Sequence, residues 1–285
     1  MELNKDEAIF LLTQHYGNRR LQIAKGDDLE ATVNTIIQKD LGDFCWSMDF
    51  CEFFIQQLFT QGFVPICTQV PFARKYRPIF VLLPKLHRIR CLLQNFTRLH
   101  VDRGARKKSR KYHMTIDSAF GLVIEGCIEQ HGESWLWPPM RDALLRLFEH
   151  SQHNGVVPGT AKLHSIELWN EEGNLAAGEL GYSCGAMYTS LTGFHREPST
   201  GTIQMLCIAG LLVSSSFVCW DLGMAMSYKE RLGARGMDRT EFVAMQRSLR
   251  DVESASLPAL QPPGQSASSL IDIVRAGAAN SDASI

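Results

Sequence analysis

Apolar and polar residues alternate along three consecutive segments in the second half of the chain. Between residues 162 and 169, Leu163 and Glu167 fall on one side of a period-two pattern, and His164 and Ile166 fall on the other. Such alternation is typical of β-strands, whose successive side chains point to opposite faces. Residues 172–174 read Glu-Gly-Asn, which favours a tight turn. With further strands over 175–183 and 186–191, the pattern predicts a three-stranded antiparallel meander.

An apolar helix and a further strand follow the meander. Residues 203–213 are almost continuously apolar, and Ser199 and Thr202 before them can cap a helix. We expect this helix to lie buried against the sheet and residues 217–222 to form the next strand. This order of elements is the core layout of an N-acyltransferase fold. We therefore predict an α/β (α+β) protein of the GNAT-like acyltransferase type, with a mixed, mostly antiparallel sheet.

The upstream pattern indicates a second, smaller unit. Apolar residues spaced three and four apart between Phe44 and Leu58 predict one amphipathic helix, and the proline-containing segment 63–84 predicts a short strand and turns. We place a small N-terminal α/β domain at residues 1–90 and the larger GNAT-like domain at 91–253. Residues 254–285 are rich in Ser, Ala, Pro and Gln and have little to bury, which predicts a disordered tail.

Composition narrows the class of protein. The chain has 285 residues, 45% hydrophobic and 21% charged, which is enough for a sizeable core. Its eight cysteines are scattered in apolar surroundings without a metal-ligand spacing, so we expect reduced core thiols and no metal site. The acidic start resembles no targeting segment, and no apolar run approaches the roughly 20 residues of a membrane span. We expect a cytoplasmic protein without membrane contact.

Charge is unevenly distributed along the chain. A net charge of −1 alone argues against a nucleic-acid partner, because phosphate binding depends on cationic side chains. Residues 103–111, however, contain six basic residues and no acidic one. Further basic residues precede them, namely Arg74, Lys75, Arg77, Lys85, Arg88, Arg90 and Arg98. The segment is a phosphate-binding surface, a solvated loop or a sorting signal.

Three blocks of sequence resemble the leucyl/phenylalanyl-tRNA protein transferase family, over about residues 63–242. They are A-F-G-L-V-I-E-G-C at 119–127, S-W at 134–135 with H-S-I-E-L-W at 164–169, and W-D-L-G at 220–223 followed by R-L-G-A at 231–234. The resemblance implies transfer of an amino acid, leucine or phenylalanine in the family, from charged tRNA to the α-amine of a protein with an N-terminal Lys or Arg. The product would be a degradation signal. Aminoacyl-tRNA would be the co-substrate, and we expect no bound cofactor and a monomer.

The resemblance also implies roles for single residues. Asp221 matches a strand-end Asp that orients the reacting groups, and Trp135 matches a Trp near the terminal adenosine of tRNA, on which a base can stack. The expected aminoacyl pocket contains Tyr188, Leu191 and Phe194. The basic residues interpreted as tRNA contacts are Arg106, Lys107, Lys108, Arg110 and Lys111. The alternatives are structural, a local turn bond for Asp221 and core packing for the aromatic residues.

Several positions depart from the family's pattern. The family's F-P-W-F reads V-P-I-C at 64–67, its C-G-E-S-M-F reads T-S-L-T-G-F at 189–194, and a Gln two positions beyond the functional Asp is Gly223. Leu191 thus replaces a carboxylate, while Glu179 falls where the family has an apolar residue of the side-chain pocket. We expect Glu179 either to be catalytic, as a carboxylate moved to the adjacent strand, or to recognise a cationic amine. The alternative is a Glu that faces solvent.

Two other functions stay open. An acyl-CoA N-acyltransferase shares the fold, but it holds pyrophosphate with a Gly-rich turn at a helix N-terminus, and residues 199–202 lack the basic residue and paired glycines of that turn. A non-catalytic tRNA- or degron-binding relative is the second alternative, because Ile66 and Gly223 replace residues of the family's site.

Overall fold

The computed structural model describes residues 3–17, 20–72, 76–94, 96, 99, 101, 103–252 and 255–282. Its largest element is an eight-stranded sheet with the order β10-β4-β5-β6-β7-β8-β3-β9. All neighbouring strands are antiparallel except β7 and β8, which are parallel. The strands are β3 (Ile89–Leu93), β4 (Tyr112–Ile116), β5 (Lys162–Asn170), β6 (Leu175–Cys184), β7 (Met187–His195), β8 (Cys219–Asp221), β9 (Arg235–Asp238) and β10 (Gln265–Ser266). This confirms the predicted meander and the mixed, mostly antiparallel sheet.

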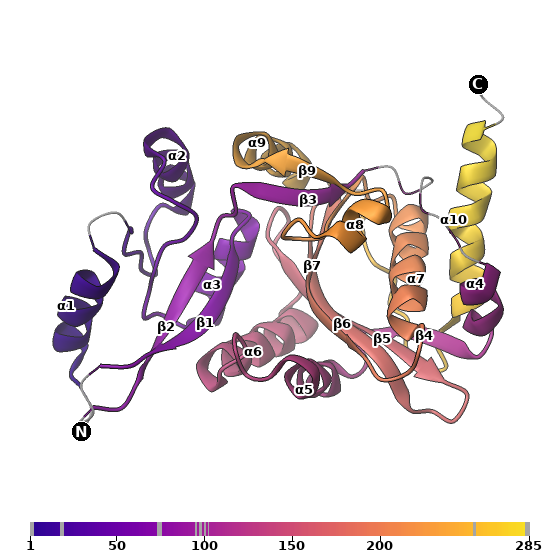
Figure 1. Ribbon diagram of the computed structural model, residues 1–285, viewed down its shortest axis with the longest axis horizontal. Helices are drawn as coiled ribbons and strands as arrows, with labels where there is room; N and C mark the ends of the chain where they lie inside the picture. Colours follow the sequence, from indigo (N-terminus) through magenta and orange to yellow (C-terminus); the bar gives the residue numbers. More distant parts are fainter. Residues whose placement is uncertain are drawn as a thin grey trace.

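Helices cover both faces of this sheet (Figure 1). On one face lie α5 (Phe120–His131) and α6 (Pro138–Asn154), which pack on β5, β6 and β7. On the other face lies α7 (Thr200–Ser214), with α10 (Ala267–Asp282) packed along its outer side. The other helices of this part of the chain are α4 (Arg103–Ser109), α8 (Ser227–Arg231) and α9 (Arg239–Arg250). The sheet is therefore enclosed between two layers of helix, which excludes water from its middle strands.

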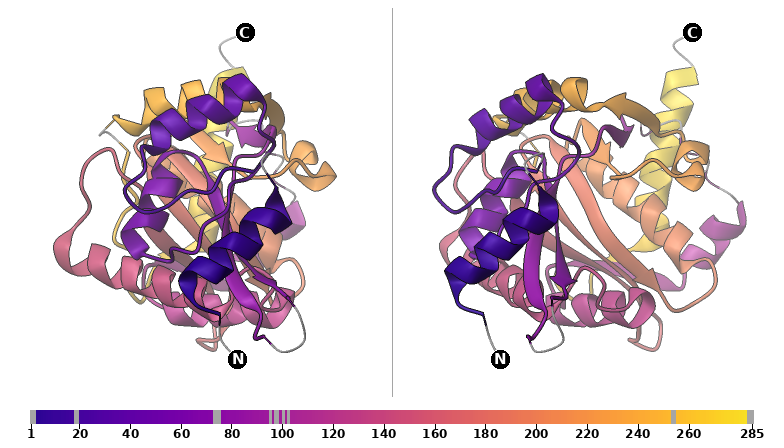
Figure 2. Two further views of the ribbon diagram at one scale, coloured as in Figure 1. Left: turned by 90° about the vertical axis from the view of Figure 1, so that its left-hand side faces the viewer. Right: turned by 60° about the vertical axis from the view of Figure 1, so that its left-hand side comes forward.

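The first 85 residues form a smaller unit beside the large sheet (Figure 1). A hairpin of β1 (Val64–Val70) and β2 (Ile79–Lys85) carries α1 (Lys5–Tyr16), α2 (Leu29–Lys39) and α3 (Glu52–Thr60). Figure 2 shows α2 next to α9, where Arg247 donates to Asn34 over 2.9 Å. The predicted boundary at residue 90 falls inside β3, a strand of the large sheet. The division into domains stays a prediction.

The predicted helix between Phe44 and Leu58 is wrong in its first half. Only Glu52–Thr60 is helical, whereas residues 45–47 run along the hairpin. The backbone N–H groups of Cys45 and Ser47 donate to Pro84 and Leu82 over 3.0 and 2.9 Å. Because an open strand edge offers the backbone these partners, the segment stays extended although its apolar spacing suits a helix.

The prediction of a disordered tail is also wrong for the part of it that the structure describes, residues 255–282. Residues 267–282 form α10, in which Leu270, Ile271 and Val274 are buried. The cause lies in α7, which is apolar on nearly all sides and has to be covered on the face turned away from the sheet. Gly210 of α7 permits the contact, since a Cβ atom there would lie 2.1 Å from the backbone oxygen of Leu270.

Candidate functional site

A cavity of about 730 Å³ opens between the hairpin, the large sheet and α7. Ile66 and Trp135 line it on the hairpin side, where the Cys67 N–H donates to the Trp135 oxygen over 3.2 Å. Strands β6 and β7 provide one wall, and α7 provides another. Residues 222–229, which run from the end of β8 into α8, provide a third. Of the matched sequence blocks, Trp135 and Leu222 line the cavity, and its wall also includes positions that depart from the family's pattern, such as Ile66, Leu191 and Gly223.

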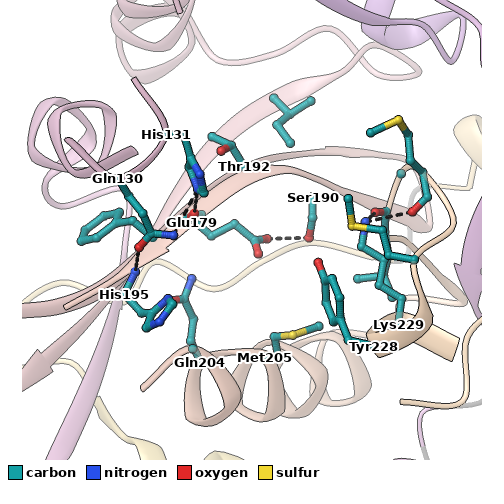
Figure 3. Close-up of a pocket in the computed structure, with 18 of the residues that line it drawn as sticks. Gln130, His131, Glu179, Ser190, Thr192, His195, Gln204, Met205, Tyr228 and Lys229 are labelled. Carbon is teal, nitrogen blue, oxygen red and sulfur yellow. Dashed lines mark hydrogen bonds between the residues drawn. The ribbon is translucent and has the colours of Figure 1, made fainter. Parts of the chain in front are cut away.

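Glu179 stands on β6 in the wall of the cavity (Figure 3). Only 7% of the residue is exposed, so the alternative of a Glu that faces solvent is wrong. Its Oε1 accepts hydrogen bonds from Ser190 Oγ at 2.7 Å and from Tyr188 Oη at 3.0 Å. Burial raises the pKa of Glu179 to about 7, although these two hydrogen bonds and the nearby Lys229 ammonium lower it. A carboxylate that titrates near neutrality can both take up and release a proton.

Asp221 lies at the end of β8 and is completely buried. It forms an ion pair with Arg90, whose Nε lies 3.2 Å from Oδ1 and whose Nη2 also donates to Oδ2. Thr189 Oγ1 and the Gly223 N–H complete its partners, at 3.2 and 2.8 Å. Asp221 does not line the cavity, but Gly223 does. Asp221 therefore fixes the turn that forms part of the cavity wall.

Arg90 is a residue that the sequence analysis placed wrongly, among the basic residues of an exposed surface. Its side chain is 0% exposed, donates to the Gly62 oxygen at 3.3 Å and lies over the Phe242 ring. Arg88, the next basic residue upstream, forms an ion pair with Asp40 at 2.6 Å. The available signal was the position of Arg90 between Ile89 and Cys91 in an apolar run, where a charge needs a buried partner.

The residues of the expected aminoacyl pocket lie at different depths. Leu191 and Phe194 line the cavity. Phe194 fits between α5 and β6 because Gly126 and Gly178 face it, where a Cβ atom would lie 2.5 and 2.6 Å from its Cε1. Tyr188 was expected in the pocket, but it does not line the cavity. It is fully buried beside Gly181 and contacts the site only through its hydrogen bond to Glu179.

A second, smaller hollow lies beside α4. It has a volume of about 450 Å³ and is lined by Val101, Arg103, Arg106, Lys107, Arg110 and Arg275. Arg106 is engaged by Asp272 of α10, over 2.7 and 3.1 Å. Lys108 donates to Ser199 Oγ at 3.0 Å, and Ser199 lines the large cavity. Lys108, on the helix that carries most residues of the hollow, therefore links α4 to a residue of the large cavity. Arg74, Lys75 and Arg98 lie outside the described residues.

Other kinds of site find no support in the part of the chain that the structure describes. Within it, no three His, Cys, Asp or Glu side chains are grouped so that they could hold a metal ion. None of its helices combines the length and apolarity that crossing a membrane requires. The eight cysteines are free thiols, and all except Cys51 are buried, as the sequence predicts.

Fold and cavity together define an α/β protein with an internal site for a small chemical group next to a cationic surface. The sequence model described as leucyl/phenylalanyl-tRNA protein transferase matches residues 93–247. The chain belongs to the leucyl/phenylalanyl-tRNA protein transferase family.

Relatives in this family include proteins named leucyl/phenylalanyl-tRNA–protein transferase. That of Maridesulfovibrio salexigens is 31% identical over 160 residues, which are 54% of this chain and 62% of the relative. That of Stutzerimonas stutzeri is 32% identical over 149 residues, 50% of this chain and 61% of the relative. That of Shewanella woodyi is 27% identical over 152 residues, 52% and 60%. The chain thus spans about three fifths of the length of the relatives that it matches.

Proposed function

We propose that this protein transfers an amino acid from charged tRNA to the N-terminal α-amine of a protein. The observation that carries the proposal is Glu179, a buried carboxylate with a pKa of about 7 in the wall of a cavity of about 730 Å³. Family membership supports the reaction class. The cationic hollow beside the cavity suits the phosphates of a tRNA whose charged end enters the cavity.

The chemistry requires little beyond positioning and one proton acceptor. An aminoacyl ester is already activated, and an α-amine has a pKa of about 8, so roughly a fifth of it is neutral at physiological pH. The amine nitrogen attacks the ester carbonyl, the new C–N bond forms, and the bond to the ribose 3′-oxygen breaks. Glu179 accepts the proton that the amine loses and returns it to the leaving oxygen. Holding both substrates in one cavity supplies the rest of the rate.

Asp221 is a positioning residue in this proposal. Its partners are Arg90, Thr189 and the Gly223 N–H, so no lone pair is directed at a substrate. Trp135 has a half-buried ring at the cavity and is proposed to stack on the terminal adenosine. Lys107, Lys108, Arg110 and Lys111 are proposed to contact tRNA phosphates, with a smaller share for Arg106 because Asp272 already engages it.

The remaining parts of the proposal come from the family resemblance. They are an acceptor with an N-terminal Lys or Arg, use of the product as a degradation signal, a cytoplasmic location, action without a bound cofactor and a monomeric state. The donor amino acid is the part for which the cavity wall supplies its own argument, given below.

The test is transfer from a full set of radiolabelled aminoacyl-tRNAs to a model protein with N-terminal Lys or Arg. Glu179→Gln keeps the size of the side chain and removes the proton acceptor, so we expect kcat to fall about 100- to 10,000-fold with every donor. The wild-type rate should rise with pH through about 7, and the variant should lose this step. Glu125→Gln on the exposed face of α5 is the matched control and should leave the rate unchanged.

Two outcomes would overturn the proposal. Retained tRNA binding without transfer from any donor would identify a non-catalytic relative. Transfer of an acyl group from acyl-CoA, but not from aminoacyl-tRNA, would identify the other use of this fold.

A further inference from the structure

Gln204 is a buried polar residue for which the proposed chemistry has no use. It lies in the second turn of α7 and is only 4% exposed, yet it belongs to the wall of the cavity. Among the residues that the structure describes, none forms a hydrogen bond with its carboxamide, and the carboxamide atoms are not sealed from the cavity that Gln204 lines. Figure 3 shows the carboxamide directed away from α7, towards His195 and the strand that carries Glu179. The Gln204 carboxamide is therefore free to form hydrogen bonds with a molecule that enters the cavity.

A buried amide of this kind discriminates between ligands. Buried polar groups in proteins are nearly always paired, because loss of water without a new partner is costly. A ligand that enters with an apolar group next to Gln204 removes water and returns no hydrogen bond. A site built to bind a polar group rejects the analogue that lacks it more strongly than an apolar pocket rejects an extra group. The carboxamide thus favours a partner that also donates and accepts.

We propose that Gln204 reads the side chain of the transferred amino acid, and that this side chain is uncharged and polar, an amide or a hydroxyl. The inference rests on the proposed transfer reaction. It departs from leucine and phenylalanine, whose side chains would leave the Gln204 carboxamide unpaired.

The charges around the cavity disfavour a charged side chain. Two lysines, Lys85 and Lys229, line it, whereas Glu179 is the one carboxylate among the described lining residues. Lys229 is 9% exposed, and its ammonium donates to the Leu222 and Met224 oxygens. A charged side chain of either sign would lose its hydration and meet a group of its own sign in this wall. An uncharged polar side chain avoids both.

The position of Gln204 assigns it to the donor and not to the acceptor. The acceptor in the proposed reaction begins with Lys or Arg, whose cationic end is better matched by the Glu179 carboxylate than by an uncharged carboxamide in the same cavity. A residue 4% exposed is also within reach only of a group as small as a side chain, since the tRNA and the acceptor chain both have to leave by the opening.

The experiment compares donors within one protein preparation, so that differences in folding cancel. The kcat/KM values for glutaminyl-, asparaginyl-, seryl- and threonyl-tRNA are divided by that for leucyl-tRNA, in the wild type and in Gln204→Leu. We expect wild-type ratios above one, and a fall of about 10- to 100-fold in the variant, the effect of removing one buried hydrogen-bonding partner. Gln94→Leu, at an exposed Gln outside the cavity, is the control and should keep the wild-type ratios.

A readout that a merely structural role would not move separates Gln204 from Glu179. Gln204→Leu should change the donor ratios and leave the pH dependence of kcat intact, whereas Glu179→Gln should do the opposite. Preference for leucyl- or phenylalanyl-tRNA with ratios unchanged in Gln204→Leu would overturn the inference and leave the proposed function standing. Preference for arginyl- or lysyl-tRNA would overturn the uncharged class, and a ratio that depends on the acceptor's first residue would overturn the assignment to the donor.

Binding gives a test that does not need turnover. Adenosine carrying glutamine or leucine through a stable 3′-amide can be titrated by calorimetry. Tighter binding of the glutamine compound, lost in Gln204→Leu, would support the subsite even if no transfer occurred, and such an outcome would contradict the proposed function alone. Equal binding of the two compounds would contradict the subsite.

Discussion

Asp221 and Glu179 are carboxylates on nearby strands of one sheet, but they differ in how completely their hydrogen-bonding and ionic partners surround them. Asp221 on β8 is fully buried and has a guanidinium, a hydroxyl and a backbone N–H as partners. Glu179 on β6 has two hydroxyl donors on one oxygen, faces a cavity, and has its pKa raised to about 7 by burial. A buried charge with a complete set of partners holds the fold together, whereas one whose partners are incomplete is available for chemistry.

The largest expected effect concerns the paired carboxylate. Asp221→Ala leaves the Arg90 guanidinium buried without a counter-charge, which should lower the free energy of unfolding by about 3–5 kcal/mol. The measurement is urea denaturation followed by circular dichroism. The double variant Arg90→Met/Asp221→Leu removes both charges and should recover most of the loss. A single variant as stable as the wild type would show that the pair is not structural.

The second expected effect concerns Glu179, which has no ion-pair partner among the described residues. It is a change of the free energy of unfolding with pH, and its sign can be derived. Since the pKa of Glu179 is about 7 in the folded protein and 4.5 ordinarily, the folded state holds an extra proton between these pH values. Stability contributed by this group is therefore lost as pH rises through that window, by about 3 kcal/mol in total.

Glu179→Gln lacks this loss. The difference in free energy of unfolding between variant and wild type should grow by about 3 kcal/mol from about pH 4 to about pH 8, measured by urea denaturation at each pH. Parallel stability curves for the two proteins would contradict the raised pKa, and with it the contrast between the two carboxylates.

A third effect tests the packing that holds the cavity wall. Gly126→Ala places a Cβ atom 2.5 Å from the Phe194 ring, which is 3% exposed and has little room to move. We expect a loss of about 1–3 kcal/mol of stability. Gly121→Ala in the same helix meets no atom within 4 Å and should stabilise the protein by up to about 1 kcal/mol. Thermal denaturation of both variants measures these changes in stability. If both variants were stabilised or both destabilised, the result would contradict the close contact at Gly126.

The smallest expected effect compares a paired and an unpaired basic residue in the cationic hollow. Lys107 has no ion-pair partner among the described residues, whereas Arg106 is engaged by Asp272. Lys107→Ala should reduce the slope of log affinity for tRNA against log salt by about 1, and Arg106→Ala should reduce it less. Fluorescence titrations at several salt concentrations measure both slopes. Equal reductions would show that pairing with Asp272 does not restrain Arg106.

The sequence predicted the large sheet well and its surroundings poorly. Alternation and a Gly-containing turn specify the meander locally, so β5, β6 and β7 appear where expected. The conformation of residues 45–47 and of α10 depends instead on what covers them, a strand edge and the outer face of α7. Local periodicity carries no information about such partners.

The site was predicted only in part, because several of its contacts join residues that are far apart in the sequence. Glu179 drew attention because a carboxylate stands at a position where an apolar residue was expected, and the structure places it in the cavity wall. The partner of Asp221 was missed, since Arg90 lies 131 positions away and only the folded sheet joins them. Gln204 was missed because a single amide in an apolar helix gives no signal until the cavity beside it is known.

The place of β3 in the sheet has a consequence for how the chain acquires its structure. The strand lies between β8 and β9, so both of its neighbours are made more than a hundred residues after it. At a synthesis rate of about 5–20 residues per second, Arg90 waits roughly 7–26 s for Asp221. Until then, this arginine has no carboxylate partner on β8, and β3 has neither of its neighbouring strands. Folding therefore depends on contacts between distant parts of the chain, which places it among slow folders that are exposed to misassembly before completion.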